Sequence, residues 1–480
     1  MIITNKTNQM RNIYIFIIAI VVQTFYVSGQ SSITTYNLQE CIDIALLNNL
    51  DLKSAELRAE TANINFKQSK NALLPRLNGN YNIGKTNGRS IDPFTNSYIN
   101  EELTFSNAGL NLGATFFNGF QLINRWKQQK LNMKASEMEK EDAKYNLVLN
   151  VTLAYLQVMN SKDLYVLAQN RMENTNEQLN RLKSMFEEEM ANPSDYRDFQ
   201  GLKANDEANL VSSKNNFEDA KLNLMSLLNT DVDFDIATID MSVDLSMYSE
   251  SFDDIYAQAL ENMAIVKASE FRLQAAEKGV SVAKSLYVPE ISLFANLGTN
   301  YSSAARIFNE TGTSIVETGD FVTVGGQDYQ VMSEQTSFTP ENISYKDQFE
   351  NNLNSSAGIS VSVPIFNGFN AKNSVALEKI RKEEATIELE RIKLQLRTAI
   401  EQTYKDMIAA YERFELLKQQ AEAYEESMRI NEVRFTNGVN NSVDYIISKN
   451  NLENARINLN NVKYEYLLRV KLLEYYKGKI

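Results

Sequence analysis

The chain has no histidine, one cysteine, one tryptophan and only six prolines among its 480 residues. Without histidine, the commonest general base and the commonest metal ligand are missing. A single cysteine, Cys41, excludes an intramolecular disulfide and a cysteine-cluster zinc site. Since no histidine can activate its thiol, we expect Cys41 to be a packed apolar residue. These absences argue against catalytic residues and a metal site, and therefore against a secreted enzyme.

Acidic residues outnumber basic ones by 61 to 48, so the formal net charge is −13, which argues against nucleic acid as a partner. The N-terminus is different: Lys6 and Arg11 precede an apolar run over residues 13–22, and small residues follow at 27–29. This order is typical of a signal peptide over residues 1–29, with a mature chain of residues 30–480. A membrane anchor is the alternative, for which the run is short. We expect an exported protein.

The chain contains an internal repeat in two gapless registers. Residues from Ala45 match those from Ala259 at an offset of 214, and the tetrapeptide F-N-G-F, which occurs at Phe117 and Phe366, sets an offset of 249. Repeat one covers residues 37–229, repeat two covers 251–478, and residues 230–250 link them. Because the offset grows, repeat two is expected to carry a longer insertion before its F-N-G-F.

Each repeat begins with a segment of helical pattern, over residues 37–74 and 251–288. Asn37 and Ser251 are expected N-caps, each with an acid three residues later. Pro75 and Pro289 end these segments, because a residue before proline disfavours the helical region.

Two stretches of period-two alternation follow in each repeat, within hairpins over residues 76–117 and 290–366. Such strands of about 10 residues, with one apolar and one polar face, have the length that crosses a bilayer. The expected apolar stripes include Leu77, Tyr81, Ile83, Leu110, Leu112, Phe116, Ile359, Val361, Val363 and Ile365. The expected polar face includes Asn78, Asn80, Asn82, Asn111, Ser360 and Ser362.

The period becomes helical after each F-N-G-F. Residues 120–186 contain no proline and would form a helix of about 100 Å. Turns are expected at 191–194 and 437–441, and the returning helices should end at Asn229 and Gly478, which suit a left-handed terminus. The fold class is therefore mainly α with β (α+β), built from long antiparallel helical hairpins.

Four strands per chain are too few to close a barrel, which needs about eight. Because a bilayer tolerates no open sheet edge, the barrel must be shared between subunits. A dimer would supply eight strands and a trimer twelve, and the polar face would line a wet lumen.

The duplicated helix–hairpin–helix order, the F-N-G-F joints and the segment RFTNGVNNSVDYIISKNNLENARINL from Arg434 together resemble the TolC-type outer membrane efflux proteins. The resemblance covers residues 37–478. It implies a homotrimer with a twelve-stranded outer membrane β-barrel and a long periplasmic α-barrel. It also implies an α/β band formed by residues 230–250 with 33–36. The implied function is the exit duct of tripartite efflux or type I secretion, fed by an inner membrane pump through a periplasmic adaptor, with no cofactor and no catalysis.

By the same resemblance, acids at the periplasmic tip form the gate, which points to Asp195, Asp198 and Asp444. The alternative is that Asp195 and Asp444 cap the returning helices, where acids suit the helix dipole. The joint between barrel and helices is assigned to both F-N-G-F copies. Asn118 and Asn367 would cap the next helix, Gly119 and Gly368 would let the backbone turn, and Phe120 and Phe369 would join an interfacial aromatic girdle.

A different function class also has to be considered. An exported coiled-coil spacer or adhesin without a transport role would explain the helices and the export signal. It would not explain four amphipathic strands placed symmetrically in two repeats.

Overall fold

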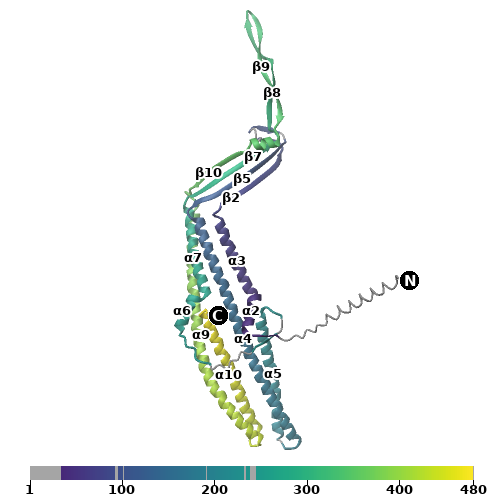
Figure 1. Cartoon of the computed structure of the whole chain (residues 1–480), viewed down its shortest axis with the longest axis vertical. Helices are drawn as coiled ribbons and strands as arrows, with labels where there is room; N and C mark the ends of the chain where they lie inside the picture. Colours follow the sequence, from purple (N-terminus) through teal and green to yellow (C-terminus); the bar gives the residue numbers. More distant parts are fainter. Residues whose placement is uncertain are drawn as a thin grey trace, which may run out of the picture. The chain divides into compact units, whose positions relative to one another are not determined.

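The computed structural model (Figure 1) describes residues 34–478, apart from 92–95, 101, 191, 232–233 and 238–244. The expected signal peptide lies outside these described residues. Among them, no helix is both long and apolar enough to cross a bilayer. The chain divides into two compact units. The helical unit comprises residues up to 57, 139–264 and 393–480, and the sheet unit comprises 58–138 and 265–392.

The two repeats contain the same sequence of elements, with additions in repeat two. Repeat one follows β1 (Thr34–Tyr36) and consists of α2 (Leu38–Asn48), α3 (Leu50–Asn71), β2 (Arg76–Thr86), β3 (Arg89–Ile91), β4 (Tyr98–Asn100), β5 (Leu103–Asn118), α4 (Gln121–Glu187) and α5 (Pro193–Leu228). After β6 (Phe234–Ile236), repeat two consists of α6 (Phe252–Asn262), α7 (Ala264–Lys284), the 3-10 turn η1 (Ser285–Tyr287), β7 (Glu290–Ser302), β8 (Arg306–Val324), β9 (Gln327–Asn342), α8 (Tyr345–Asn351), β10 (Asn354–Ser362), α9 (Asn370–Thr436) and α10 (Ser442–Tyr476).

Each of the segments of helical pattern over residues 37–74 and 251–288 is divided into two α-helices. Each is broken at equivalent positions, Asn49 and Met263, where the backbone is extended, with ψ of 127° and 124°. The side chain of Asn49 accepts hydrogen bonds from the N–H groups of Asp51 and Leu52, both at 3.0 Å, and so starts α3. The expected N-caps are confirmed, since Asn37 and Ser251 accept from residues 40 and 254.

Four strands form one antiparallel sheet in the order β10-β7-β5-β2. Its register places apolar residues opposite one another on one face, because Leu77 pairs with Leu112 and Leu110 with Leu297. The other face carries amides, where Asn111 lies between Asn78 and Asn296. The alternation in the sequence thus becomes two chemically distinct faces of a single sheet.

The ends of two predicted stripes differ from expectation. A bulge between Thr115 and Phe117 places Phe117 opposite Ile291, so Phe116 leaves the regular register. Strand β10 ends at Ser362, so Val363 and Ile365 lie beyond it. Pro364 accounts for the second difference, because proline lacks the N–H that a continued ladder would need.

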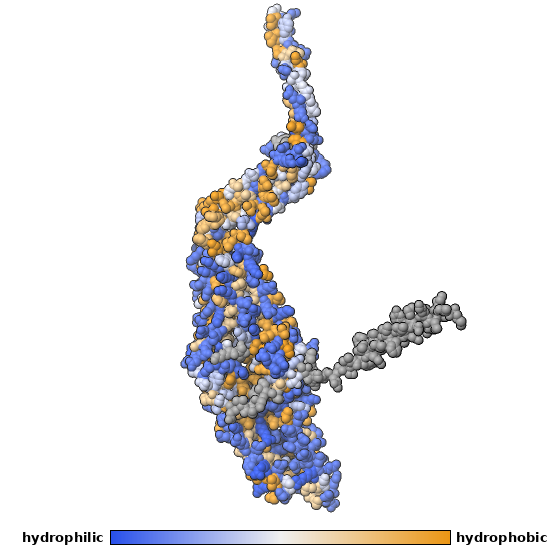
Figure 2. All heavy atoms as spheres, in the orientation of Figure 1, coloured by the Kyte–Doolittle hydropathy of each residue, from blue (hydrophilic) through white to orange (hydrophobic). Residues whose placement is uncertain are grey.

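The apolar face of the sheet is largely uncovered. Leu77, Ile83 and Ile359 keep 66%, 67% and 66% of their surface accessible. Figure 2 shows apolar side chains gathered over the sheet, whereas the helices are predominantly hydrophilic. A face of this size and composition is unusual in contact with water and marks a surface that meets lipid or protein.

The insertion expected in repeat two is a long hairpin. Strands β8 and β9 pair from Arg306 with Asn342 to Val324 with Gln327. The two-residue turn between them is Gly325-Gly326, with φ of 65° and 91°, which suits the mirror-image turns of hairpins. Helix α8 then returns the chain to the sheet, where the side chain of Gln348 bonds both the N–H and the carbonyl of Ser302.

The core of the helical unit joins the strand that precedes repeat one to the linker between repeats. Strands β1 and β6 pair in parallel, with Thr34 opposite Phe234. The hydroxyl of Tyr155 donates to the carbonyl of Ala237 at 2.6 Å. Cys41 is fully buried in this core, and burial raises the pKa of its thiol to about 12. The expectation of a packed cysteine is confirmed.

Candidate functional site: joints, tip and polar cluster

Left-handed backbone conformations mark the joints of both repeats. Gly119 and Phe120 have φ of 63° and 62°, and Gly368 and Phe369 have 61° and 62°. Two further left-handed pairs are Glu189 with Gly438 and Asn229 with Gly478, also separated by 249 residues. Since L side chains adopt this region at a cost, its recurrence at four matching positions reflects duplicated turns.

The side chains of F-N-G-F are also arranged alike in both copies. Phe117 meets Phe120 edge to face at 5.4 Å, and Phe366 meets Phe369 edge to face at 5.6 Å. Asn118 differs from its counterpart, because its side chain accepts from the N–H of Leu122 at 3.4 Å. Asn367 instead accepts through its main-chain carbonyl, from Asn370. The expected side-chain cap is therefore present only at Asn118, whereas the edge-to-face pair of phenylalanines occurs in both copies.

The prolines at 75 and 289 directly precede β2 and β7. Near them, the two joint glycines differ in what surrounds them. A Cβ on Gly119 would lie 2.8 Å from Cβ of Val288, whereas a Cβ on Gly368 would meet nothing within 4 Å. Gly119 thus permits a close approach within the chain, and Gly368 faces open space.

At the opposite end of the long helices, each turn is closed by an asparagine. Asn192 accepts from the N–H of Ser194 at 3.0 Å, and Asn441 accepts from the N–H of Asp444 at 2.9 Å. Asp195 and Asp444 therefore occupy the third position of their helices and are not the N-caps. Their charge still suits the helix dipole, and the side chain of Asp444 remains exposed.

Asp198 connects the tips of the two repeats. Its carboxylate accepts from the hydroxyl of Ser442, at the start of α10, at 3.0 Å. Ser442 itself is 1% exposed. The structure therefore ties Asp198, one of the three expected gate acids, to the second repeat.

The tip is held by an aromatic core. Phe186 stacks on Tyr196 at 5.0 Å, and the equivalent residues of repeat two, Phe435 and Tyr445, lie 4.9 Å apart. Phe199 joins the two repeats, because it packs on both Phe435 and Tyr445. The acids of the tip thus lie next to an apolar core that both repeats share.

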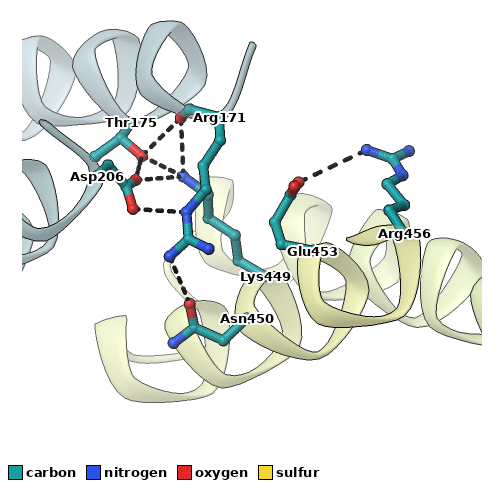
Figure 3. Close-up of polar contacts among 7 residues, drawn as sticks. All are labelled: Arg171, Thr175, Asp206, Lys449, Asn450, Glu453 and Arg456. Atoms are coloured by element: carbon teal, nitrogen blue, oxygen red, sulfur yellow. Dashed lines mark hydrogen bonds and ion pairs between the residues drawn. The ribbon is translucent and has the colours of Figure 1, made fainter. Parts of the chain in front are cut away.

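A buried polar cluster lies between the repeats farther along the same helices (Figure 3). Asp206 of α5 accepts from Nε of Arg171 at 2.6 Å and from the hydroxyl of Thr175 at 2.6 Å, both from α4. Lys449 of α10 contacts the same carboxylate at 3.4 Å and also donates to Thr175. Arg171 donates in addition to the side chain of Asn450 at 3.0 Å. These contacts join α10 to the α4–α5 hairpin.

The charges in this cluster are almost completely removed from water. Asp206 is 1% exposed and Lys449 is 4% exposed. Burial lowers the pKa of Lys449, although the Asp206 carboxylate opposes that shift. Burial raises the pKa of neighbouring Glu453, against the effect of Arg456. Breaking a buried pair by removing one partner leaves an uncompensated charge, at a cost of about 3–5 kcal/mol.

The cluster of Arg171, Asp206 and Lys449 was not among the sites predicted from the sequence. The signal was the position of the charges on buried seams, since Asp206 follows Leu202 by four residues and Lys449 lies between Tyr445 and Leu452. A charge at such a seam position is expensive to bury and therefore needs a partner.

The fold defines a class: a duplicated protein in which long helical hairpins continue from the strands of an amphipathic antiparallel sheet. Among known families, the one described as "Outer membrane efflux protein" matches residues 41–230 and 255–478, one span in each repeat. The chain belongs to this family.

Individual relatives are distant but span most of the chain. It is 22% identical over 440 residues to the probable efflux pump outer membrane protein TtgC of Pseudomonas putida, covering 87% of this chain and 78% of that protein. It is 20% identical over 450 residues to the outer membrane protein TolC of Escherichia coli, covering 92% and 82%. The fold is similar to that of VceC from Vibrio cholerae, with a TM-score of 0.73, 15% identity and coverage of 92% and 96%.

Family membership confirms the α+β fold class and the outer membrane location. It also identifies a transport protein of the efflux class, not an enzyme, and rules out the spacer or adhesin alternative.

Proposed function

We propose that three copies of this chain assemble into a closed duct, which carries substrates through the outer membrane. The observation that carries the proposal is the four-stranded sheet, whose edge strands β2 and β10 each have one neighbour within the described chain. One face of the sheet is apolar and uncovered, and the other is lined by amides and hydroxyls. Since a sheet edge cannot stay unpaired in lipid, β10 of one subunit would pair with β2 of the next.

The repeat supplies the register for this pairing. Within the chain, Asn111 of β5 lies opposite Asn296 of β7. By the two repeat offsets, β10 is the equivalent of β5 and β2 is the equivalent of β7. Adding 249 to Asn111 and subtracting 214 from Asn296 therefore places Ser360 opposite Asn82 of a neighbouring subunit. The same operation brings Ile359 opposite Ile83. Polar residues then meet polar ones and apolar residues meet apolar ones, as a continuous barrel requires.

The open space at Gly368 supports the same assembly. Gly119 packs against Val288, whose equivalent in repeat one is Leu74. Leu74 is 62% exposed in the single chain. In the proposed trimer, Leu74 of a neighbouring subunit would fill the space beside Gly368, so each joint would have the same surroundings.

The helical unit would form the periplasmic part of the duct. Asp195, Asp198 and Asp444 at its tip are proposed to form the gate, because three copies of each acid around a narrow axis would repel one another and attract cations. The buried cluster of Arg171, Asp206 and Lys449 would hold the two hairpins of each subunit together behind this gate. An inner membrane pump and a periplasmic adaptor are the proposed partners that deliver the substrate.

The experiment that tests the proposal uses outer membranes from cells that express the full chain. We expect a trimer that runs intact on SDS gels without heating and separates into single chains when boiled. The purified trimer should conduct ions in planar bilayers. A monomer in the soluble fraction, or a membrane trimer with no conductance, would contradict the proposal.

A further inference from the structure

The apolar face of the sheet contains a distinct hollow of about 440 Å³. Its volume lies within the range of ligand-binding pockets. The hollow crosses β2, β5 and β7 and reaches the residue before β10. It is lined by Gly79, Asn80, Tyr81, Ala108, Gly109, Leu110, Leu297, Gly298, Thr299 and Leu353.

The hollow exists because small residues interrupt an otherwise bulky surface. Gly79 lies opposite Leu110, and Ala108 lies opposite Tyr81. The equivalent of Gly79 in repeat two is Leu293, whose side chain projects from the surface and is 43% exposed. Repeat two therefore lacks the small residue that opens the hollow in repeat one.

Helix α8 lies beside the hollow and places aromatic rings there. The carbonyl of Phe349 accepts from the hydroxyl of Thr299 at 2.7 Å. The ring of Tyr345 lies 4.8 Å from that of Tyr301 and 4.5 Å from that of Phe349. This short helix is therefore fixed against the strand that forms one side of the hollow.

A group of three hydroxyls lies where α8 meets the hollow. The hydroxyls of Tyr81 and Tyr345 lie 3.2 Å apart, and Ser106 donates to Tyr345 at 3.1 Å. Tyr81 and Tyr345 are 56% and 42% exposed. The hollow is thus apolar along its length and has hydrogen-bonding groups at one end. This arrangement is complementary to an acyl chain, whose hydrocarbon part is apolar and whose ester linkage accepts hydrogen bonds.

The position of these hydroxyls along the strand agrees with a membrane interface. Ser106 and Phe117 are eleven positions apart on β5. At about 3.4 Å per residue and a tilt of about 40°, this separation spans about 28 Å across the bilayer, close to the hydrocarbon thickness. Phe117 belongs to the joint that leads into the helices, so the hydroxyl cluster lies at the opposite, outer interface.

We propose that the hollow binds one acyl chain of an outer-leaflet lipid, with its ester or headgroup at the Tyr81–Tyr345 hydroxyls. The inference rests on the proposed function, because the apolar face must be the lipid-facing side of the barrel. Lipid is the fitting occupant, since the hollow is continuous with a surface that the outer membrane covers. A neighbouring β10 would extend the sheet beside β2 and leave the hollow open.

The test compares two substitutions of the same kind. Ala108→Leu fills the hollow, whereas Ala295→Leu adds the same side chain to the same face outside the lining. The full-length protein is stripped of lipid in detergent. Dipalmitoyl phosphatidylethanolamine or lipid A is then added, and bound lipid is counted per chain by native mass spectrometry. We expect the wild type and Ala295→Leu to bind one lipid per chain, and Ala108→Leu to bind at least about tenfold more weakly.

Equal binding by all three proteins, or no binding by the wild type above non-specific attachment, would overturn the proposal. If Ala108→Leu does not fold, Gly79→Ala narrows the hollow with a smaller disturbance, because the nearest atom to its Cβ would be the flexible end of Leu110 at 3.3 Å, followed by the carbonyl of Gly109 at 3.9 Å. Stronger binding of lipid A supports an outer-leaflet occupant, and binding of phosphatidylethanolamine alone would overturn that assignment.

The same spectrum separates this proposal from the proposed function. The hollow is formed by a single chain, so lipid binding can be measured in any oligomer. A monomer that still binds lipid would count against the trimeric duct, whereas a conducting trimer without bound lipid would count only against the hollow.

Discussion

The two repeats have kept the same backbone turns but have diverged in the charges that they bury. Left-handed residues recur at matching positions, and the N-cap, helix break and F-N-G-F joint occur in each repeat. The polar cluster has no such counterpart: the equivalents of Arg171, Asp206 and Lys449 are Gln420, Ala455 and Gln200. Turn geometry is thus retained at the F-N-G-F joints and at the ends of the long helices, whereas the buried cluster is specific to the contact between repeats.

The largest expected effect comes from breaking the cluster of Arg171, Asp206 and Lys449, which has no counterpart at the equivalent positions. Asp206→Ala would leave Arg171 and Lys449 buried without their carboxylate, and should lower the free energy of unfolding by about 3–5 kcal/mol. Thermal unfolding followed by circular dichroism would measure the change. Glu207→Ala is the control, because Glu207 forms an exposed pair with Lys203 and should change stability by less than about 0.5 kcal/mol. Equal effects would mean that the cluster contributes no special stability.

A second difference between repeats concerns Asp142, whose equivalent is the exposed Arg391. Burial raises the pKa of Asp142 from 3.8 to about 6, although Asn146 donates a hydrogen bond to it. The folded state then binds more protons than the unfolded state between about pH 4 and pH 6, so this group makes stability fall as pH rises through that window.

Asp142→Asn should therefore stabilise the protein at pH 7 by about 1–3 kcal/mol, with little effect below pH 4. Melting temperatures of wild type and variant across this pH range would show the convergence. Parallel curves would contradict the role of Asp142.

The joint glycines offer a sharper comparison, since their backbone conformations are alike and only their neighbours differ. Gly119→Ala should cost about 1–2 kcal/mol of left-handed strain plus a clash with Val288 in the single chain. Gly368→Ala carries the same strain, and its clash would arise only when Leu74 of a neighbour is present. We expect Gly119→Ala to reduce folding yield and Gly368→Ala to reduce chiefly the dissociation temperature of the oligomer on SDS gels. If both variants lost the same amount of folded chain, this would contradict the placement of Leu74 of a neighbouring subunit beside Gly368.

The smallest effect should be at the tip, where the two repeats share an acid at 195 and 444. Asp195→Ala combined with Asp444→Ala should raise single-channel conductance in planar bilayers, because the ring of like charges is removed from the gate. Ser442→Ala is a separate variant that releases Asp198 and tests the link between hairpins. Unchanged conductance in the double variant would favour a purely helix-stabilising role for these acids.

Much of this architecture could be predicted from the sequence, because it depends on local signals. Prolines, glycines and the change from period two to period 3.6 locate the strands, joints and long helices within a few residues. The break at Asn49 was missed because it depends partly on a distant contact, in which its side chain donates to the carbonyl of Leu227 at 3.2 Å. Phe116 was misplaced because the bulge appears only when β5 is paired with β7.

The candidate site was less predictable for the same reason. Asp195 and Asp444 could be located from the repeat, but Asn192 and Asn441 as the true caps required hydrogen-bond geometry. The partnership of Asp206 with Lys449 joins residues from different repeats, and spacing along one helix cannot reveal which distant charge balances it.

The most direct test of the account is the predicted pairing between subunits. In a Cys41→Ala background, Ser360→Cys combined with Asn82→Cys should form a disulfide between chains in intact outer membranes. The cross-linked product should be a covalent trimer on non-reducing gels. Val361→Cys with Asn82→Cys, whose side chains would lie on opposite faces, should not cross-link. Failure of the first pair, or equal cross-linking of both, would contradict the closed duct with this register.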